Sequence, residues 1–231
     1  DPHDVMPPSA LAHIPLGTLL NHTSGLPNWS SQAMKPSPAP GQLWQYSGEG
    51  YMLLQGVLEA VSGQHFSDFM DSQVFTPLGM NHSSLIWHEQ HHSEVHSDAI
   101  PGLWAPRPGK FKHALAAASL YTTAPDYGKF ICAVLRQEKL LALTLSSPVK
   151  VDRSLGLEWG YGWGIERSNN GPHLWHWGNN PGFRSFAMFS PVSGNGLVAF
   201  TNHYQGIAMA SRIAQDVLPG EHQAFNFHMV Y

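Results

Sequence analysis

Two hydroxyl-bearing residues stand directly before a strongly helical segment. Tyr46 and Ser47 precede Gly48 in the stretch WQYSGEGYMLLQGVLEAVSG, residues 44–63. A tyrosine hydroxyl can pass a proton between reacting groups, and a serine hydroxyl can bind a free backbone N–H at the start of a helix. A tyrosine in such a place is usually a packed ring with its hydroxyl at the surface, so Tyr46 alone does not indicate chemistry.

A second candidate group lies near the end of a predicted strand. The stretch HWGNNPGF, residues 176–183, begins with His176 and has Gly178 two residues later. Because glycine has no side chain, another group can approach its backbone closely, and a strand edge can present N–H groups to a developing oxyanion. A glycine after an aromatic strand is also typical of an ordinary turn. Taken together, this stretch and Tyr46 are more informative than either alone.

The stretch SPVK matches the nucleophile pattern S-x-x-K literally at Ser147 and Lys150. On a helix, a lysine one turn after a serine can take the proton of the hydroxyl. This match lies in a weakly patterned stretch and follows Tyr46, so we interpret it as a chance match and leave the nucleophile unassigned. Ser24 and Ser47 have no partner lysine, and we interpret them as turn and cap residues.

Histidine is unusually frequent, with 15 residues in the chain. His88, Glu89 and His92 form H-E-x-x-H, which on a helix places two imidazoles one turn apart for zinc. The segment has little apolar periodicity, and a third ligand from Glu94 or His96 would need difficult geometry. We therefore expect a solvated histidine-rich loop that binds metal adventitiously, and no cofactor.

Four helical segments are predicted from apolar periodicity, and short strands fill the region between the third and the last. The helical patterns are Leu54, Val57, Leu58 and Val61 up to Gly63; Phe66, Phe69, Met70 and Val74; Tyr127, Phe130, Ile131, Val134 and Leu135 after the cap Thr123; and Ala210, Ile213, Ala214 and Val217. Cys132 and most of the tryptophans, namely Trp159, Trp163, Trp175 and Trp177, are expected in the core.

Between the third and last helices, aromatic or β-branched runs alternate with the turn sequences SNNGP, NNPG and SPVSGNG. This pattern predicts an antiparallel meander followed by a helix and hence an α+β fold. We expect one domain over residues 1–231. Residues 15–150 would be mostly helical, and residues 156–218 would form the strands and the C-terminal helix.

Composition excludes several function classes. The chain has 231 residues, 42% of them hydrophobic, and a net charge of -4 without a run of Lys or Arg, so nucleic acid is not an expected partner. No apolar run is long enough for a membrane span. The first residues lack the features of a signal peptide, and localisation stays open, with a periplasmic or secreted protein among the options.

Six motifs occur together in the order and spacing of one family. They are LLNHTSGLP, YSGEGYMLLQGVLEAVSG, VFTPLGM, AAASLYTTAPDYGKF, YGWG and HWGNNPGF. In these motifs the sequence resembles the serine β-lactamase-related superfamily, which holds class C β-lactamases, penicillin-binding DD-peptidases and family VIII carboxylesterases. The resemblance runs from about residue 1 to about residue 218.

The resemblance implies an antiparallel sheet flanked by helices beside a mostly helical subdomain, with the active site between them. It also implies an acyl-enzyme mechanism built from S-x-x-K, a Tyr-x-Asn motif and a Lys/His-x-Gly strand motif. By this likeness Tyr46 relays protons, and His176, Trp177 and Gly178 form the strand motif. Asn179 would give a backbone N–H to the oxyanion hole, with Ser47 and Gly48 beside the substrate.

The sequence departs from that family in two ways. Gly48 stands where the family has an asparagine that helps to position substrate. The family's nucleophile motif lies upstream of the HTSGL block, roughly two dozen residues before this chain begins, and Asp1 and Pro2 resemble the segment that follows it. We therefore expect an N-terminally incomplete domain that lacks this motif and the first strands of the sheet.

Three hypotheses remain open. The first is a serine hydrolase acting on a small ester, amide or β-lactam, inactive in this chain if the nucleophile motif is missing. The second is a non-catalytic relative that binds ligands in the same cleft, and the third is a metal-dependent hydrolase that uses the cluster His88, His92 and His96. An incomplete sheet would expose an unpaired edge, so we also expect self-association near the stretch GLVAFTN.

Overall fold

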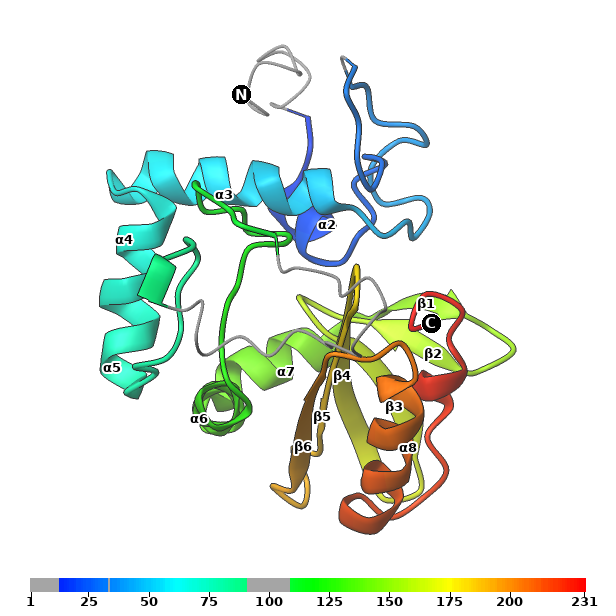
Figure 1. Ribbon diagram of the computed structural model, residues 1–231. Coiled ribbons are helices and arrows are strands. Elements are labelled where there is room, and N and C mark those ends of the chain that lie inside the picture. Colours follow the sequence, from blue (N-terminus) through cyan, green and yellow to red (C-terminus); the bar gives the residue numbers. More distant parts are fainter. Residues whose placement is uncertain (1–12, 33, 91–108) are drawn as a thin grey trace.

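The computed structural model describes residues 13–32, 34–90 and 109–231, and it contains a group of helices beside an antiparallel sheet that has helices of its own on both faces (Figure 1). The helices are α2 (Leu16–Leu20), α3 (Gly48–Ser62), α4 (Phe66–Met70), the π-helix η2 (Asp71–Phe75), α5 (Thr76–Leu78), α6 (Ala124–Leu135), α7 (Glu138–Ser146), α8 (Gly206–Val217) and the 3-10 helix η4 (Gln223–Asn226). The strands are β1 (Val149–Asp152), β2 (Leu157–Trp159), β3 (Gly164–Ser168), β4 (Gly171–Asn180), β5 (Phe183–Phe189) and β6 (Gly196–Thr201). This arrangement confirms the predicted α+β fold.

The sheet is the predicted meander, with its strands side by side in the order β1-β2-β3-β4-β5-β6 and every pair antiparallel. Glycines at positive φ stand where neighbouring strands connect, for example Gly171 with a φ of 97° at the start of β4 and Gly182 with a φ of 79° just before β5. The sheet begins earlier than predicted, because β1 precedes residue 156. Within the described residues, β6 has a strand neighbour on one side alone.

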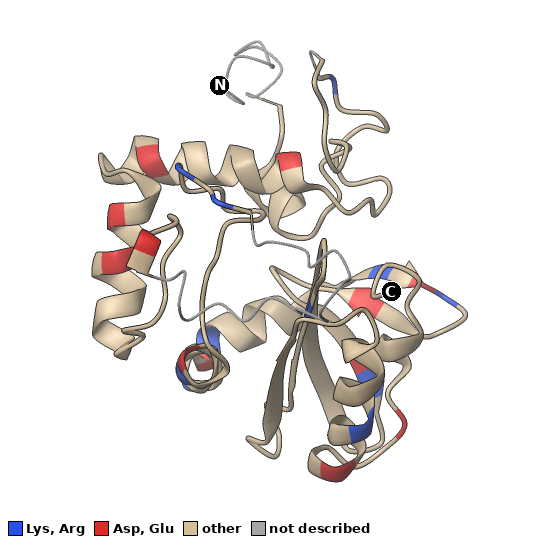
Figure 2. Ribbon diagram, in the orientation of Figure 1, with Lys and Arg blue, Asp and Glu red and all other residues tan. Residues whose placement is uncertain are grey.

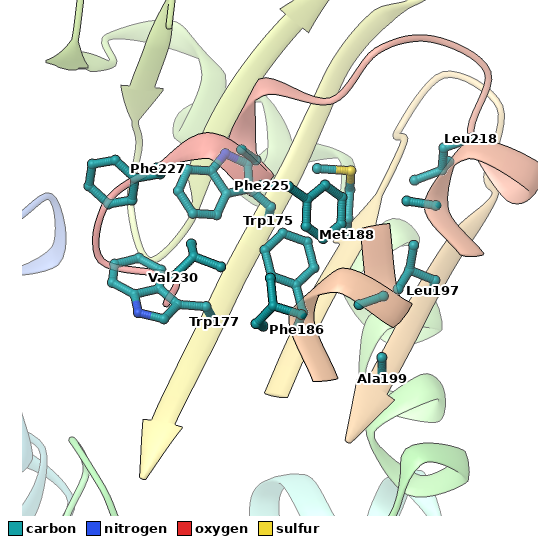
Figure 3. Close-up of a cluster of buried hydrophobic side chains, with 14 of the residues drawn as sticks. Trp175, Trp177, Phe186, Met188, Leu197, Ala199, Leu218, Phe225, Phe227 and Val230 are labelled. Carbon is teal, nitrogen blue, oxygen red and sulfur yellow. The ribbon is translucent and has the colours of Figure 1, made fainter. Parts of the chain in front are cut away.

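Helices cover both faces of the sheet. The face that carries Trp175 and Phe186 packs against Ala210 and Ala214 of α8 and against the C-terminal segment, whose Phe225 and Phe227 lie beside the strands in Figure 3. On the opposite face, Trp163, Leu174 and Phe189 form a second cluster. They pack against Ile131 and Val134 of α6 and against Leu141 of α7. The predicted core positions of the four tryptophans are confirmed, since Trp159, Trp163, Trp175 and Trp177 are all buried.

The starts of two helices follow from their capping residues. The Ser47 hydroxyl accepts a hydrogen bond from the Gly50 N–H at the start of α3, and the Thr123 hydroxyl accepts one from the Asp126 N–H at the start of α6. Both caps satisfy backbone N–H groups that have no partner within their helix. The cap interpretations of Ser47 and Thr123 are therefore confirmed.

The helices confirm one sequence expectation and correct two. The helix predicted from Leu54, Val57, Leu58 and Val61 is confirmed as part of α3; Leu54 packs against Leu19 and Leu26, whereas Val61 is 84% exposed. Cys132 is exposed on α6 instead of lying in the core. Helices α2 and α7 were not predicted, because each is short and α7 buries just Leu141 and Thr144.

Charged residues of both signs are distributed over the described elements (Figure 2). Helix α8, for example, carries both Arg212 and Asp216. In the ranges that the structure describes, no helix has the length and hydropathy that crossing a bilayer would require.

Candidate active site

The two principal site candidates from the sequence lie close together where the helical part meets the sheet. Tyr46 directly precedes the Ser47 cap of α3, and His176 lies on β4. Their ring centroids are 6.3 Å apart, and the Tyr46 ring lies 4.9 Å from the ring of Trp177. Trp159 of β2 contacts both Tyr46 and His176 and holds the two rings in place, with centroid separations of 6.2 and 5.3 Å.

Within the described residues, the end of β4 that carries His176 and Trp177 has a strand neighbour on one side alone. Strand β3 pairs with β4 only as far as Gly164 opposite Trp175, whereas β5 pairs with β4 from Leu174 to its last residue, Asn180. Among the described strands, residues 176–180 are therefore hydrogen-bonded on one side alone. Backbone groups on the other side are available to a ligand that lies along the strand.

His176 has a defined tautomer. Its Nδ1 lies 2.9 Å from the carbonyl oxygen of Trp177. Because a carbonyl can only accept, Nδ1–H donates, and Nε2 keeps its lone pair. Burial lowers the pKa of His176, although the bond to Trp177 acts in the opposite direction. His176 is therefore a neutral imidazole at neutral pH, with an acceptor nitrogen.

Tyr46 is a neutral phenol in the same surroundings. Burial raises its pKa to about 12, because the phenolate would lose solvation among the aromatic rings of Trp44, Trp159 and Trp177. At neutral pH the hydroxyl keeps its proton. It can donate that proton while accepting another, which is what a relay needs.

His22 is a further member of this site that sequence reasoning missed. Its ring lies 4.3 Å from the ring of Tyr46 and 5.0 Å from that of Tyr51. The Ser47 N–H donates to His22 Nδ1 over 3.1 Å, so Nε2 carries the proton. The His22 Nε2–H is buried and has no hydrogen-bond partner among the described residues.

The surroundings of His22 keep it uncharged. Burial lowers its pKa to about 3, and the nearby His176 contributes in the same direction. Its backbone φ of 58° is unusual for a residue with a side chain and fixes where the ring points. His22 stands in the LLNHTSGLP block, so the signal that could have found it was a buried histidine within a recognised motif.

Ser47, Gly48 and Ser24 are engaged in the local fold. The Ser47 hydroxyl donates to the Pro27 carbonyl over 2.8 Å in addition to capping α3, and the Ser24 hydroxyl accepts from the Leu26 N–H in a turn. The turn interpretation of Ser24 is confirmed. A Cβ on Gly48 would lie 2.8 Å from the Asn28 carbonyl oxygen and 2.9 Å from the Trp29 ring. The Asn28–Trp29 segment therefore occupies the space that an asparagine side chain would need.

Gly178 and Asn179 lie further along β4. A Cβ on Gly178 would come within 2.3 Å of the hydroxyl oxygen of Ser185, its cross-strand partner on β5. Because glycine has no Cβ, the Ser185 side chain can pack directly against the β4 backbone. The exposed Asn179 side chain donates to the Tyr231 carbonyl over 3.2 Å. Asn179 lies opposite Arg184 of β5, and its oxyanion role stays a prediction.

The literal S-x-x-K match does not have the geometry of a nucleophile. Ser147 ends α7 with an extended φ of -145°, and Lys150 lies within β1 opposite Glu158. A serine and a lysine activate each other when they share one helical turn, and these two residues do not. The structure therefore argues against Ser147 and Lys150 as a nucleophile and its base.

The histidine cluster does not form a zinc helix in its described part. His88 lies outside any helix, and Glu89 and Gln90, which end this described range, have 3-10 rather than α-helical geometry. Glu89 forms an ion pair with Lys110 at 3.2 Å. His92 and His96, the other two residues of that hypothesis, lie outside the described residues.

The sequence is similar to those of curated proteins. Penicillin-binding protein 4* of Bacillus subtilis is 25% identical over 212 residues, which cover 74% of this chain and 47% of that protein. Teichoic acid D-alanine hydrolase of Staphylococcus aureus is 25% identical over 153 residues, covering 59% of this chain and 38% of that protein. The chain thus spans about half, or less, of the length of these curated relatives.

A solved class C beta-lactamase has the same fold, with a TM-score of 0.75 at 17% identity over 92% of this chain and 72% of that chain. The family described as Beta-lactamase matches residues 4–218. That match includes Tyr46 and His176 and covers most of the sequence. The chain belongs to the beta-lactamase family of serine hydrolases and penicillin-binding proteins.

Proposed function

We propose that this protein is a serine hydrolase that acts through an acyl-enzyme, with Tyr46 and His176 in its active site. The observation that carries the proposal is the position of the Tyr46 ring 6.3 Å from His176 at the edge of β4 that has no strand neighbour within the described residues. A substrate lying along that edge would have a proton relay and a row of backbone groups on the same side.

Each residue has a distinct role in this proposal. Tyr46, a neutral phenol, passes a proton from the attacking hydroxyl to the leaving group. His176 accepts a hydrogen bond from the substrate through Nε2, because its Nδ1–H is bound to the Trp177 carbonyl. The N–H of Asn179 contributes to an oxyanion hole, and Gly178 and Trp177 line the strand beside it. The nucleophile is unassigned.

The proposed substrate is a small ester, amide or β-lactam. Relatives carry names that refer to penicillin binding and to hydrolysis of teichoic acid D-alanine, and acyl transfer to serine is chemistry that such substrates share. The Trp29 ring packs against Gly48 and fills part of the volume that the asparagine side chain occupies in the family. This favours substrates that need no hydrogen bond from a side-chain amide at that position. A D-alanyl ester and a penicillin are the two probes that separate these classes.

Intact-mass spectrometry after incubation with penicillin or an activated ester tests the proposal. The complete gene product is expected to show one adduct, released more slowly when Tyr46 is replaced by Phe. The chain of 231 residues alone is expected to show none, because its one S-x-x-K lies across the end of α7 and β1. No adduct on the complete gene product would contradict the hydrolase proposal and favour a non-catalytic ligand-binding relative. An adduct on Ser24, Ser47 or Ser147 would contradict the assignment of the site.

We also propose that the chain self-associates through β6. This strand has a neighbour on one side within the described residues, and its sequence GLVAFT has no charged side chain. Uncharged edge strands are templates for pairing with another chain. The opposite edge strand, β1, carries Lys150 and Asp152 and is protected in the way that natural edges usually are.

A further inference from the structure

A buried carboxylate and two buried imidazoles meet beneath the C-terminal segment, on the sheet face that packs against α8. Glu166 of β3 lies directly opposite His173 of β4, and His222 precedes η4 and covers both. The three residues are 3%, 1% and 8% exposed. One ligand atom from each lies within 4.8 Å of the other two. In Figure 1 the C-terminal segment, drawn in red, returns along the sheet at this place.

Hydrogen bonds around the cluster leave two acceptors facing each other. His222 Nε2 lies 2.8 Å from the Leu218 carbonyl, so Nε2–H donates to it. In a neutral imidazole, Nδ1 then presents a lone pair to the carboxylate oxygen of Glu166, which is 3.2 Å away. Two such acceptors need a shared proton or a cation between them.

His173 supplies the second observation that points to a ligand. Its Nδ1 is buried and has no hydrogen-bond partner in the described part of the chain. The ring lies 5.1 Å from the ring of His222, at an interplanar angle of 80°. A buried polar atom without a partner costs about 1–3 kcal/mol, and an imidazole with such an atom beside a carboxylate is a suitable place for a ligand.

We propose that Glu166, His173 and His222 bind a zinc-class divalent transition-metal ion. Two imidazole nitrogens and one carboxylate oxygen suit Zn²⁺ and its neighbours, whereas Ca²⁺ and Mg²⁺ prefer oxygen ligands alone. The surrounding bonds are those expected around metal ligands. The backbone Leu218 carbonyl orients His222, and the Ala224 N–H donates over 2.7 Å to the second oxygen of Glu166.

The ion would fasten the C-terminal segment to the sheet. His222 and Ala224 belong to that segment, while Glu166 and His173 belong to adjacent strands, so one ion would join three parts of the chain. Phe225 follows directly and packs on Phe186, as Figure 3 shows. The proposed site is therefore structural, and it does not depend on the proposed hydrolase function.

The experiment must separate this site from the histidine-rich segment. In a background with His88, His91, His92 and His96 changed to Gln, the protein is stripped with a chelator, loaded with ZnCl₂ and dialysed. We expect one equivalent of zinc by elemental analysis and a higher melting temperature than the stripped protein. Adding His173→Gln should remove both effects, whereas adding His203→Gln, a control in the loop between β6 and α8, should leave both unchanged.

A measurement on the unaltered protein guards against a variant that fails to fold. Anomalous diffraction from a zinc-loaded crystal is expected to give a peak between Glu166, His173 and His222. Zinc that is absent after dialysis, that persists in the folded His173→Gln variant, or that appears elsewhere in the anomalous map would overturn the proposal. Each of these results would mean that a shared proton, and not a metal ion, joins Glu166 to His222.

Discussion

The imidazole of His22 packs against the phenol ring of Tyr46, with 4.3 Å between the ring centroids. Because the pKa of His22 is about 3, this neighbour carries no charge at neutral pH and does not stabilise a phenolate. The pKa of Tyr46 is accordingly raised by burial to about 12. Tyr46 can therefore relay a proton as a neutral phenol, and it would become a base only if a cation were brought next to its hydroxyl.

Removing the Tyr46 hydroxyl should impair catalysis without disturbing the fold. The ring of Phe in Tyr46→Phe can keep the contacts with Trp177 and His22, so the free energy of unfolding should change little. Positioned proton transfer typically contributes about 10²–10⁴-fold to a rate. We expect kcat/KM of the complete gene product for an activated ester to fall by that factor.

The matched control is Tyr51→Phe. Tyr51 also contacts His22, but its hydroxyl donates to the Leu20 carbonyl over 3.2 Å. Loss of this bond should lower the free energy of unfolding by about 1 kcal/mol and leave kcat/KM within a few fold. Equal losses of activity in the two variants would show that Tyr46 has no special role.

Burial of neutral His22 should make the protein less stable as the pH falls. The pKa is lowered from 6.5 when unfolded to about 3 when folded, so below pH 6.5 the unfolded state binds a proton that the folded state does not. His22 should thus remove on the order of 2 kcal/mol of stability between pH 7 and pH 5. The titratable groups that face His22 are Tyr46, Tyr51 and His176. The pKa of His176 is also lowered by burial.

His22→Asn isolates this contribution. Asparagine tolerates the positive φ of 58° and can accept the Ser47 N–H, but it does not titrate. Urea unfolding at pH 7 and pH 5 should show a smaller difference for the variant than for the parent protein. The same pH dependence in both proteins would mean that His22 is protonated in the fold.

Local patterns predicted much of the fold. Apolar periodicity and the caps Ser47 and Thr123 located the principal helices, because these signals lie within a few residues of each other. Turn sequences located the meander. The five-residue helix α2 has too few turns for any periodic signal, and the exposure of Val61 depends on what packs against α3.

The candidate site could be predicted only in part. The motifs in HWGNNPGF and YSGEGY pointed to His176 and Tyr46, and the structure places the two rings together. The role of His22 depends on its bond with the Ser47 N–H, which joins residues 25 positions apart, so no local pattern contains it. The requirement for glycine at position 178 likewise comes from a cross-strand contact with Ser185, which no local pattern contains.

Restoring the family's asparagine should strain the start of α3. In Gly48→Asn the new Cβ would lie 2.8 Å from the Asn28 carbonyl oxygen and 2.9 Å from the Trp29 ring. Overpacking of this kind typically costs about 1–3 kcal/mol, so the urea midpoint should fall. Adding Trp29→Ala should recover part of the loss, because the indole contact disappears while the Asn28 contact remains. A Gly48→Asn variant as stable as the parent would show that the Asn28–Trp29 segment moves aside without a cost in free energy.

The two edges of the sheet should differ in association. β6 carries no charge, whereas β1 carries Lys150 and Asp152, so a lysine added to β6 should have the larger effect on pairing. Light scattering coupled to gel filtration is expected to show a mass that rises with protein concentration. Val198→Lys on β6 should shift the protein toward monomer, and the matched Val151→Lys on β1 should not. A concentration-independent monomer, or equal effects of the two lysines, would refute pairing through β6, because edge pairing requires both an available strand and an uncharged one.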